Sequence, residues 1–464
     1  MSLSLYDNYT RSLRPFSPLN LNGEVGLYTC GPTVYNDQHI GNYRTFLFED
    51  GLKRVLTWNG YRVCHVMNIT DVGHLTSDAD SGEDKMEKGA RRVGKTAWEI
   101  AKIYTDAFLN DLDRLGIARP TILCRAKDHI KEQIDFIVDI EKKGYTYQTD
   151  DGIYFDTSKQ NDYGHLARLH REGLEAGKRV DTGGKKNITD FALWKFSPRE
   201  GKRQMEWESP WGIGFPGWHI ECSAMAQKYL GNYFDIHCGG EDHISIHHTN
   251  EIAQTQARCG TRLANFWLHG YFLLSNDEKM AKSAGEFLRV QSLIDRGYDP
   301  MAYRYLCLTA HYRKQLSFTW DALDAAAVAL DRLRHGFFSL PADPHALPDD
   351  VILNEITLAM NDDLNFPRAL AICWDTLRKT ADAKIKRATL ARVDDVLGLR
   401  LSQWQPQEVL VPDAVIALAN ARQAARSAKN WAEADRARQA IADLGWEIED
   451  KPEGYRMKPI GKKS

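Results

Sequence analysis

The sequence lacks the features that mark several large classes of protein. No apolar run approaches the ~20 residues that a membrane-spanning helix requires, and the N-terminal segment MSLSLYDNYTRSLRPF has no apolar core of a signal peptide. Eight cysteines in 464 residues are too few for a scaffold held by disulfides. We therefore expect a cytoplasmic chain, not attached to a membrane, whose cysteines are mostly reduced.

The chain also has little net charge. A formal charge of −3 supplies no global basic field for nucleic acid, although a local basic patch remains compatible with that value. The sequence contains no internal repeat and no low-complexity tract. Its 43% hydrophobic and 27% charged residues are typical of a folded protein. Because single cores stop growing near ~250–300 residues, several domains are expected.

The N-terminal part has a strand–helix–strand pattern. Residues 24–30 and 61–69 are apolar runs that suit buried strands. Between them, residues 43–58 predict a helix, because apolar side chains recur there at helical spacing, namely Phe48, Leu52, Val55 and Leu56. This order of elements favours an α/β fold in which helices cover a parallel sheet.

The rest of the chain changes character several times. Residues 121–204 mix helical and strand patterns before a strand returns at Tyr233–His237, which indicates a domain inserted into the sheet domain. Residues 300–400 predict several amphipathic helices. The last part predicts one helix from Asp413, a second from about Trp431 and a hairpin.

Two short motifs suit the phosphates of a nucleotide. His39-Ile40-Gly41-Asn42 stands before the predicted helix, where free N–H groups and the positive end of the helix dipole favour phosphate. Gly41 permits close approach to the backbone, and His39 can donate to a phosphate oxygen. Further on, Lys279-Met280-Ala281-Lys282-Ser283 follows a strand-like segment, and its two lysines could hold a triphosphate. Each motif alone also fits an ordinary surface loop.

A similar string, Lys85-Met86-Glu87-Lys88, lies in the charged stretch 77–97. We interpret that stretch as a surface loop and the string as solvated and far from the nucleotide motifs.

A third motif, Gly239-Gly240-Glu241-Asp242, follows the predicted strand Tyr233–His237. Glycines at the carboxyl end of a strand allow a ligand to approach closely at the usual binding edge of a parallel sheet. Asp242 can accept hydrogen bonds from a ribose. A plain Gly-Gly turn is the alternative interpretation.

Four side chains form a candidate metal site. Cys30 ends the first strand, and Cys222 lies in the segment PGWHIECSAM. His247 and Glu251 are four residues apart on a predicted helix, so they share one face. Two thiolates, an imidazole and a carboxylate are a plausible tetrahedral zinc set. Buried cysteines beside a His–Glu pair on the surface are the alternative.

Taken in order, these motifs resemble those of a known enzyme class. HIGN followed far downstream by KMAKS resembles the HIGH and KMSKS signatures of class I aminoacyl-tRNA synthetases. The blocks CGPTVYNDQHIGN, NITD, PGWHIECSAM, DIHCGGED and HHTNEIAQ resemble those of the cysteinyl-tRNA synthetase family, and the resemblance covers nearly the whole chain.

The resemblance implies an α/β architecture with a Rossmann-type catalytic domain that carries an insertion, followed by a helical bundle and a small mixed α/β domain. The implied boundaries are 1–120 and 205–262 for the catalytic domain, 121–204 for the insertion, 263–310 for the connecting segment with the KMSKS-like loop, 311–400 for the bundle and 401–464 for an anticodon-binding domain.

The resemblance also implies an activity. A monomer would activate L-cysteine with ATP to cysteinyl-adenylate and transfer it to the 3′-terminal adenosine of tRNA-Cys. One Zn²⁺ would select the thiolate of cysteine over the hydroxyl of serine, and Mg²⁺ would accompany the ATP. The zinc ligands would be Cys30, Cys222, His247 and Glu251. The catalytic residues would be His39, Asn42, Lys279 and Lys282. The residues that bind substrate and ATP would be Gly31, Thr33, Gly41, Thr70, Trp218, His237, Gly240 and Asp242.

Two positions depart from the family pattern. Asn42 replaces the last histidine of HIGH, and Ala281 replaces the serine of KMSKS, while both lysines remain. In the C-terminal unit, Trp431, Arg436 and Arg438 would contact tRNA through stacking and charge. Two alternatives stay open: a ligase of the mycothiol type that joins activated cysteine to an amine, and a non-catalytic paralogue that binds tRNA or cysteine.

Overall fold

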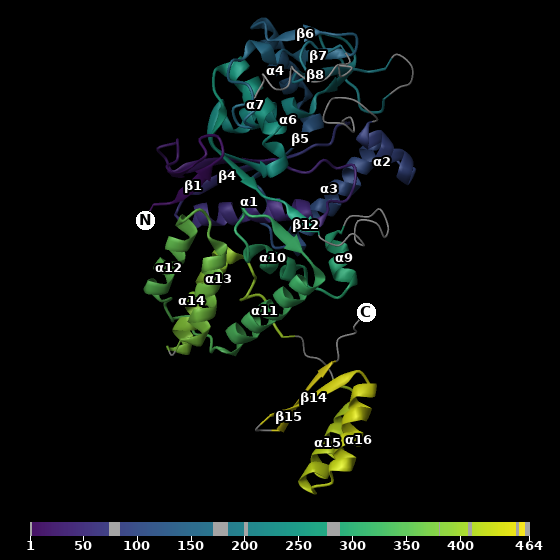
Figure 1. Cartoon of the computed structure of the whole chain (residues 1–464), viewed down its shortest axis with the longest axis vertical. Coiled ribbons are helices and arrows are strands. Elements are labelled where there is room, and N and C mark those ends of the chain that lie inside the picture. Colours follow the sequence, from purple (N-terminus) through teal and green to yellow (C-terminus); the bar gives the residue numbers. More distant parts are fainter. Residues whose placement is uncertain are drawn as a thin grey trace. The chain divides into compact units, whose positions relative to one another are not determined.

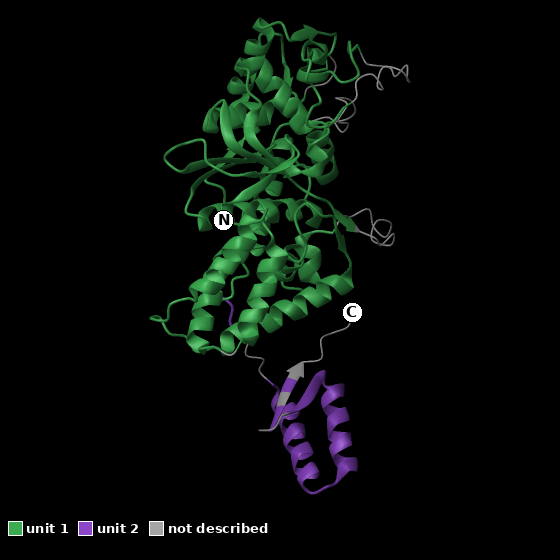
Figure 2. Ribbon diagram, turned by 60° about the vertical axis from the view of Figure 1, so that its left-hand side comes forward, with its two compact units in different colours: residues 1–402 green, residues 403–464 purple. Residues whose placement is uncertain are grey.

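The computed structural model describes residues 2–73, 84–169, 184–198, 203–275, 288–379, 381–406, 411–451 and 454–459 (Figure 1). The chain forms two compact units, residues 1–402 and 403–464 (Figure 2). Within the described parts, no helix is long and apolar enough to cross a membrane. The finer division of the first unit into four parts stays a prediction.

A five-stranded parallel sheet organises the first unit. Its order is β11-β10-β3-β4-β5, and all four pairs of neighbours are parallel. The strands are β3 (Glu24–Thr29), β4 (Arg62–Ile69), β5 (Ile122–Arg125), β10 (Tyr233–Gly240) and β11 (Leu263–Gly270). Helix α1 (Ile40–Trp58) connects β3 to β4. The predicted strands, the predicted helix and the α/β fold class are confirmed.

Hydrophobic cores lie on both faces of this sheet, because successive side chains of a buried strand point to opposite sides. Leu27 belongs to the core that contains α1, whereas Tyr28 belongs to the core that contains α6 (Trp218–Leu230) and α7 (His247–Cys259). On β4, Met67 likewise belongs to the core of α1 and Val66 to the core of α6 and α7. The apolar runs therefore encode a sheet covered on both faces.

The inserted part has a sheet of its own. Strands β6 (Thr146–Gln148), β7 (Gly152–Phe155), β8 (Phe191–Phe196) and β9 (Gly214–Pro216) form an antiparallel sheet in that order. Helix α4 (Ile130–Lys142) precedes it. In Figure 1, these elements lie together at one end of the first unit. Side chains of β7 and β8 share the core of α6 and α7, so this sheet packs against the helices on one face of the parallel sheet.

The interpretation of residues 77–97 as a loop is wrong. Residues 77–83 lie outside the described residues, but α2 spans Lys85–Val93 and is followed by α3 (Ala97–Arg114). Met86 and Ala90 are buried in the main core. The high charge of the stretch concealed one apolar face of a short helix.

The C-terminal part of the first unit, from residue 290, is mainly helical, as predicted for residues 300–400. It contains α9 (Val290–Asp295), α10 (Pro300–Leu308), α11 (Trp320–Ser339), α12 (Asp350–Asn361), α13 (Phe366–Arg378) and α14 (Ala383–Leu397). Two short parallel strands, β12 (Leu273–Ser275) and β13 (Leu316–Phe318), join this region to the sheet domain. An antiparallel pair, β1 (Ser4–Asp7) and β2 (Ser12–Pro15), begins the chain.

The second unit is a helical hairpin with a β-hairpin. It consists of α15 (Asp413–Ser427), α16 (Trp431–Asp443), β14 (Trp446–Lys451) and β15 (Gly454–Pro459), which confirms the predicted elements. Its small core contains Val415, Ile441 and Trp446. Arg422 donates to both carboxylate oxygens of Asp450, at 2.8 and 3.0 Å, and so joins α15 to the hairpin.

Candidate active site

A cavity of about 310 Å³ opens at the carboxyl ends of β3 and β10. These neighbours are the strands at which the direction of connection reverses, and such a switch point is where parallel α/β sheets bind ligands. Most of the predicted site residues line this cavity: Cys30, Gly31, Thr33, His39, Asn42, Thr70, Trp218, Cys222, Gly240, Asp242 and His247.

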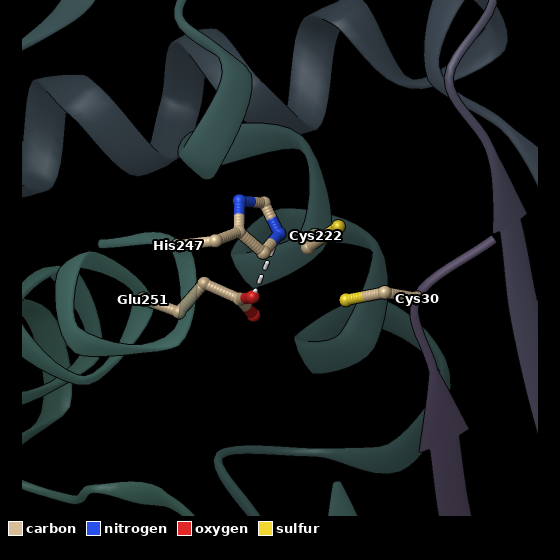
Figure 3. Close-up of side chains that lie close together, drawn as sticks. All are labelled: Cys30, Cys222, His247 and Glu251. Carbon is tan, nitrogen blue, oxygen red and sulfur yellow. Dashed lines mark ion pairs between the residues drawn. The ribbon is translucent and has the colours of Figure 1, made fainter. Parts of the chain in front are cut away.

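The predicted metal ligands come together beside the cavity, which Cys30, Cys222 and His247 line (Figure 3). One possible ligand atom of each of Cys30, Cys222, His247 and Glu251 lies within 4.8 Å of the others, and all four side chains are buried. His247 Nε2 is 3.0 Å from Glu251 Oε1. The donor set of two sulfurs, one nitrogen and one oxygen fits a tetrahedral zinc site.

The charges of this cluster also suit a cation. A hydrogen bond with Cys30 lowers the pKa of Cys222 to about 7, whereas burial raises the pKa of Cys30. Burial opposes ionisation of Glu251, but His237 and His247 lower its pKa to about 2. Burial alone would lower the pKa of His247, yet Glu251 and Cys222 raise it to about 10. Glu251 and Cys222 thus hold a proton on His247, and a bound cation would replace that proton as their positive partner.

A second layer of imidazoles supports the cluster. His237 Nε2 lies 2.9 Å from Glu251 Oε2, so His237 contacts a candidate ligand rather than the cavity wall. His248 Nε2 is 3.4 Å from Cys30 Sγ, and His248 Nδ1 is 2.8 Å from His269 Nε2. Asn8 is 2.9 Å from the far nitrogen of His269. An overlapping set, Cys30, His237, His248 and Glu251, also satisfies the geometric criterion for a metal group.

The first turn of α1, where the sequence predicts a phosphate site, forms another side of the cavity. His39 is the N-cap: its Nδ1 accepts from the backbone N–H of Asn42, and the Asn42 side chain accepts from the backbone N–H of His39. The asparagine thus fixes the start of the helix. Gly41 lies inside this turn rather than before it, and a Cβ there would be 2.9 Å from the His39 ring. Gly41 therefore leaves room for His39 and does not line the cavity.

Close approach requires a glycine at the end of β3. A Cβ on Gly31 would lie 1.7 Å from the backbone carbonyl oxygen of Asn68. A Cβ on Gly240 would lie 2.3 Å from Asp242 Oδ1, the end of a side chain that can rotate away. The backbone contact therefore explains the glycine of the CGPT motif.

The structure adds cavity residues that the sequence interpretation missed. Lys85, on the first turn of α2, lines the cavity, and its Nζ lies 5.8 Å from the ring centroid of Trp218 and 5.9 Å from that of Tyr35. The interpretation of Lys85 as solvated and remote is therefore wrong. His243 also lines the cavity, 5.0 Å from His247 between ring centroids.

Helix α2 is held toward the cavity by the end of the inserted part. Its N-cap, Asp84, accepts from the backbone N–H of Glu87 and forms a buried ion pair with Arg203. The Asp-x-x-Glu string and the left-handed Gly94 are ordinary helix boundary signals, so this helix was detectable from the sequence.

Other predicted site residues lie elsewhere. Lys279, Ala281 and Lys282 lie outside the described residues. Trp431, Arg436 and Arg438 are exposed on α16 of the second unit, where Trp431 retains 60% of its accessible surface.

Comparisons with known proteins assign the family. Residues 16–328 match the family "tRNA synthetases class I (C) catalytic domain". A cysteine–tRNA ligase 1 of Burkholderia lata is 60% identical over 458 residues, 98% of this chain and 97% of that protein. A cysteine–tRNA ligase of Zymomonas mobilis is 42% identical, with 98% and 97% coverage.

The fold agrees with this match. Methionyl-tRNA synthetase of Mycobacterium tuberculosis, solved with methionyl-adenylate, superimposes with a TM-score of 0.55 over 82% of this chain and 91% of that one, at 15% identity. Because relatives match nearly end to end at high identity, the chain belongs to the cysteine–tRNA ligase family of class I aminoacyl-tRNA synthetases.

Proposed function

We propose that this chain activates L-cysteine with ATP and attaches it to the terminal adenosine of tRNA-Cys, with a zinc ion in the amino-acid pocket. One observation carries the proposal. Three of the four clustered candidate zinc ligands, Cys30, Cys222 and His247, line the same cavity as His39, Asn42 and Asp242, and Glu251 lies beside them. A thiol and a nucleotide can therefore meet in one site.

The zinc site supports the choice of amino acid. When bound, zinc supplies a strong preference for a thiolate over an alcohol oxygen. An apolar pocket alone separates near-isosteres by only about 10–200-fold. Trp218 packs on the candidate ligand His247, with ring centroids 4.4 Å apart, and closes one side of the pocket.

Activation needs positioning rather than a protein nucleophile. The carboxylate oxygen of cysteine attacks the α-phosphorus of ATP, the bond from that phosphorus to the bridging oxygen breaks, and pyrophosphate leaves with its magnesium. His39 and the start of α1 would contact phosphate oxygens. Lys279 and Lys282 would stabilise the charge that builds on the leaving group.

Transfer completes the reaction. A hydroxyl of the terminal adenosine attacks the carbonyl carbon of the adenylate, the bond from that carbon to the phosphate oxygen breaks, and AMP leaves. Trp431, Arg436 and Arg438 would bind the anticodon, because an exposed indole can stack on unstacked bases and exposed guanidinium groups attract the backbone.

The test is cysteinylation of total tRNA by the zinc-loaded protein, measured in parallel with cysteine-dependent exchange of pyrophosphate into ATP. We expect base-labile label on tRNA with cysteine and none with serine. Exchange without label on tRNA would favour a ligase that uses an amine acceptor. Absence of both activities in folded, metal-containing protein would indicate a non-catalytic paralogue.

A further inference from the structure

Behind the wall of the amino-acid pocket lies a chain of hydrogen bonds whose direction the structure determines. Its members are the backbone N–H of Gly31 and the side chains of Asn68, Thr70 and Glu221. Asn68 and Thr70 are each 1% exposed, and Glu221 is fully buried. Gly31, Asn68 and Thr70 line the cavity, whereas Glu221 stands behind Thr70.

The first two links orient the amide. The N–H of Gly31 donates to Asn68 Oδ1 at 2.8 Å, so the oxygen of this amide must face Gly31. The amide nitrogen then faces Thr70 and donates to its hydroxyl oxygen at 3.0 Å. Because an amide NH₂ has no acceptor, the Thr70 hydroxyl cannot donate back to Asn68.

The third link follows. Thr70 Oγ1 lies 3.1 Å from Glu221 Oε2, and a carboxylate oxygen accepts, so the one proton of the hydroxyl is directed to Glu221. A hydroxyl has one proton and two lone pairs. The proton is taken by Glu221 and one lone pair by Asn68. What Thr70 retains for a ligand in the cavity is a single acceptor position.

The backbone holds this arrangement in place. Thr70 N–H donates to the carbonyl of Pro32 at 3.0 Å, and the carbonyl of Thr70 accepts from Val34 N–H at 3.2 Å. Thr70 therefore pairs with the segment that follows Cys30, the candidate zinc ligand. Thr70 lines the same cavity as the candidate zinc ligands Cys30, Cys222 and His247, so a ligand held by its sulfur shares a cavity with this acceptor.

From this geometry we infer that Glu221 is a positioning residue that fixes Thr70 as an acceptor and thereby selects thiols that carry a free α-ammonium group. The inference rests on the proposed function and deepens it. An ammonium has three donors and no acceptor, so it matches Thr70. Glu221 acts through Thr70 and does not itself line the cavity.

The experiment measures binding of three thiols to the zinc-loaded, full-length protein by calorimetry without ATP. L-Cysteine and cysteamine carry the amino group, and 3-mercaptopropionate lacks it. In Glu221→Gln we expect affinity for cysteine and cysteamine to fall by about 10- to 100-fold, the range of a lost charge-assisted hydrogen bond. Affinity for 3-mercaptopropionate should stay within about twofold.

A double-mutant cycle separates this role from a structural one. Thr70→Val should lose the amino-group preference, Thr70→Ser should retain it, and Glu221→Gln combined with Thr70→Val should be no worse than Thr70→Val alone. If the fold-losses in affinity for cysteine multiply in the double variant, the inference is overturned. Equal losses of affinity for all three thiols in Glu221→Gln would also overturn it. Loss of zinc from Glu221→Gln would also overturn it, because Glu221 would then act on its neighbour Cys222.

These binding results are independent of catalysis. A wild-type protein that prefers amino thiols but makes no cysteinyl-tRNA would contradict the proposed function and support this inference. If the wild-type protein charges tRNA, but the ratio of its affinities for cysteamine and 3-mercaptopropionate is the same in Glu221→Gln, the proposed function is supported and this inference is contradicted.

Discussion

Replacement of Arg304 by methionine should destabilise the first unit, because Arg304 is the buried cation that joins α10 to α1. Its side chain is 1% exposed and donates to Asp50 Oδ2 at 2.6 Å. It also donates to the carbonyl of Leu397 at 2.8 Å and to those of Leu115 and Gly116 at 3.3 and 3.1 Å. One guanidinium thus satisfies the ends of α14 and α3 and a carboxylate of α1.

The loss of unfolding free energy depends on which donors to Asp50 remain after Arg304 is replaced. Removal of one partner of a buried ion pair costs about 3–5 kcal/mol. Arg54 Nε and the N–H of Ala118 still donate to Asp50, at 2.7 and 2.8 Å, so the lower end, about 3 kcal/mol, applies. With an unfolding entropy of about 2.1 cal/mol/K per residue over residues 1–402, the melting temperature should fall by about 4 °C.

The pH dependence of the stability difference tests whether the unpaired Asp50 carboxylate is its cause. Burial alone would raise the pKa of Asp50, but Arg304 and Arg54 hold it below its ordinary value. A depressed pKa contributes stability above the ordinary pKa of aspartate, about 3.9, that is lost as the pH falls through the folded value. Without Arg304, burial raises the pKa of Asp50, and protonation relieves the unpaired charge in acid.

The assay is therefore calorimetric melting of wild type and Arg304→Met between pH 7.5 and pH 4. The difference in melting temperature should narrow as the pH approaches 4, and Arg304→Lys should recover part of it at pH 7.5. A variant that melts with the wild type, or a difference that does not change with pH, would refute the reasoning.

Three further outcomes are expected. Lys282→Ala should slow cysteine-dependent pyrophosphate exchange far more than it weakens cysteine binding by calorimetry, and an unchanged exchange rate would remove Lys282 from the mechanism. Cys222→Ser should lose zinc, measured by metal analysis, together with the preference for cysteine over serine; a variant that retains both would exclude Cys222 as a ligand. Trp431→Ala and Arg436→Ala should lower kcat/KM for tRNA and leave pyrophosphate exchange unchanged, whereas an equal loss in both assays would indicate a role in folding.

The parts of the site that the sequence predicted are those that short segments encode. Cys30 and Gly240 end their strands, and a parallel sheet brings such ends to one edge. His247 and Glu251 are one helical turn apart, so their shared face follows from spacing alone. Apolar periodicity was sufficient for α1, although the helix is buried on all sides over residues 46–52.

The parts that were missed depend on partners distant in sequence. Lys85 lies in a charged stretch, and its place at the cavity follows from the buried pair of Asp84 with Arg203, which no local pattern reveals. The support of Cys30 by His248, and of His248 by His269, likewise crosses the sheet between elements that only the fold brings together. Polar networks of this kind are specified by tertiary geometry.

The direction of the chain also explains why thiolates belong at this edge. Each helix that follows or precedes a parallel strand runs opposite to it, so the helix N-termini collect at the carboxyl ends of the strands. Trp218 and His247 are the first residues of α6 and α7, and the candidate ligands Cys222 and Glu251 lie one turn further on. Because helical side chains lean toward the N-terminus, both ligand atoms are directed toward the end of their helix at which the dipole is positive. The fold supplies this polarisation to any anion held at the edge, and the particular side chains determine that a thiol is the group selected.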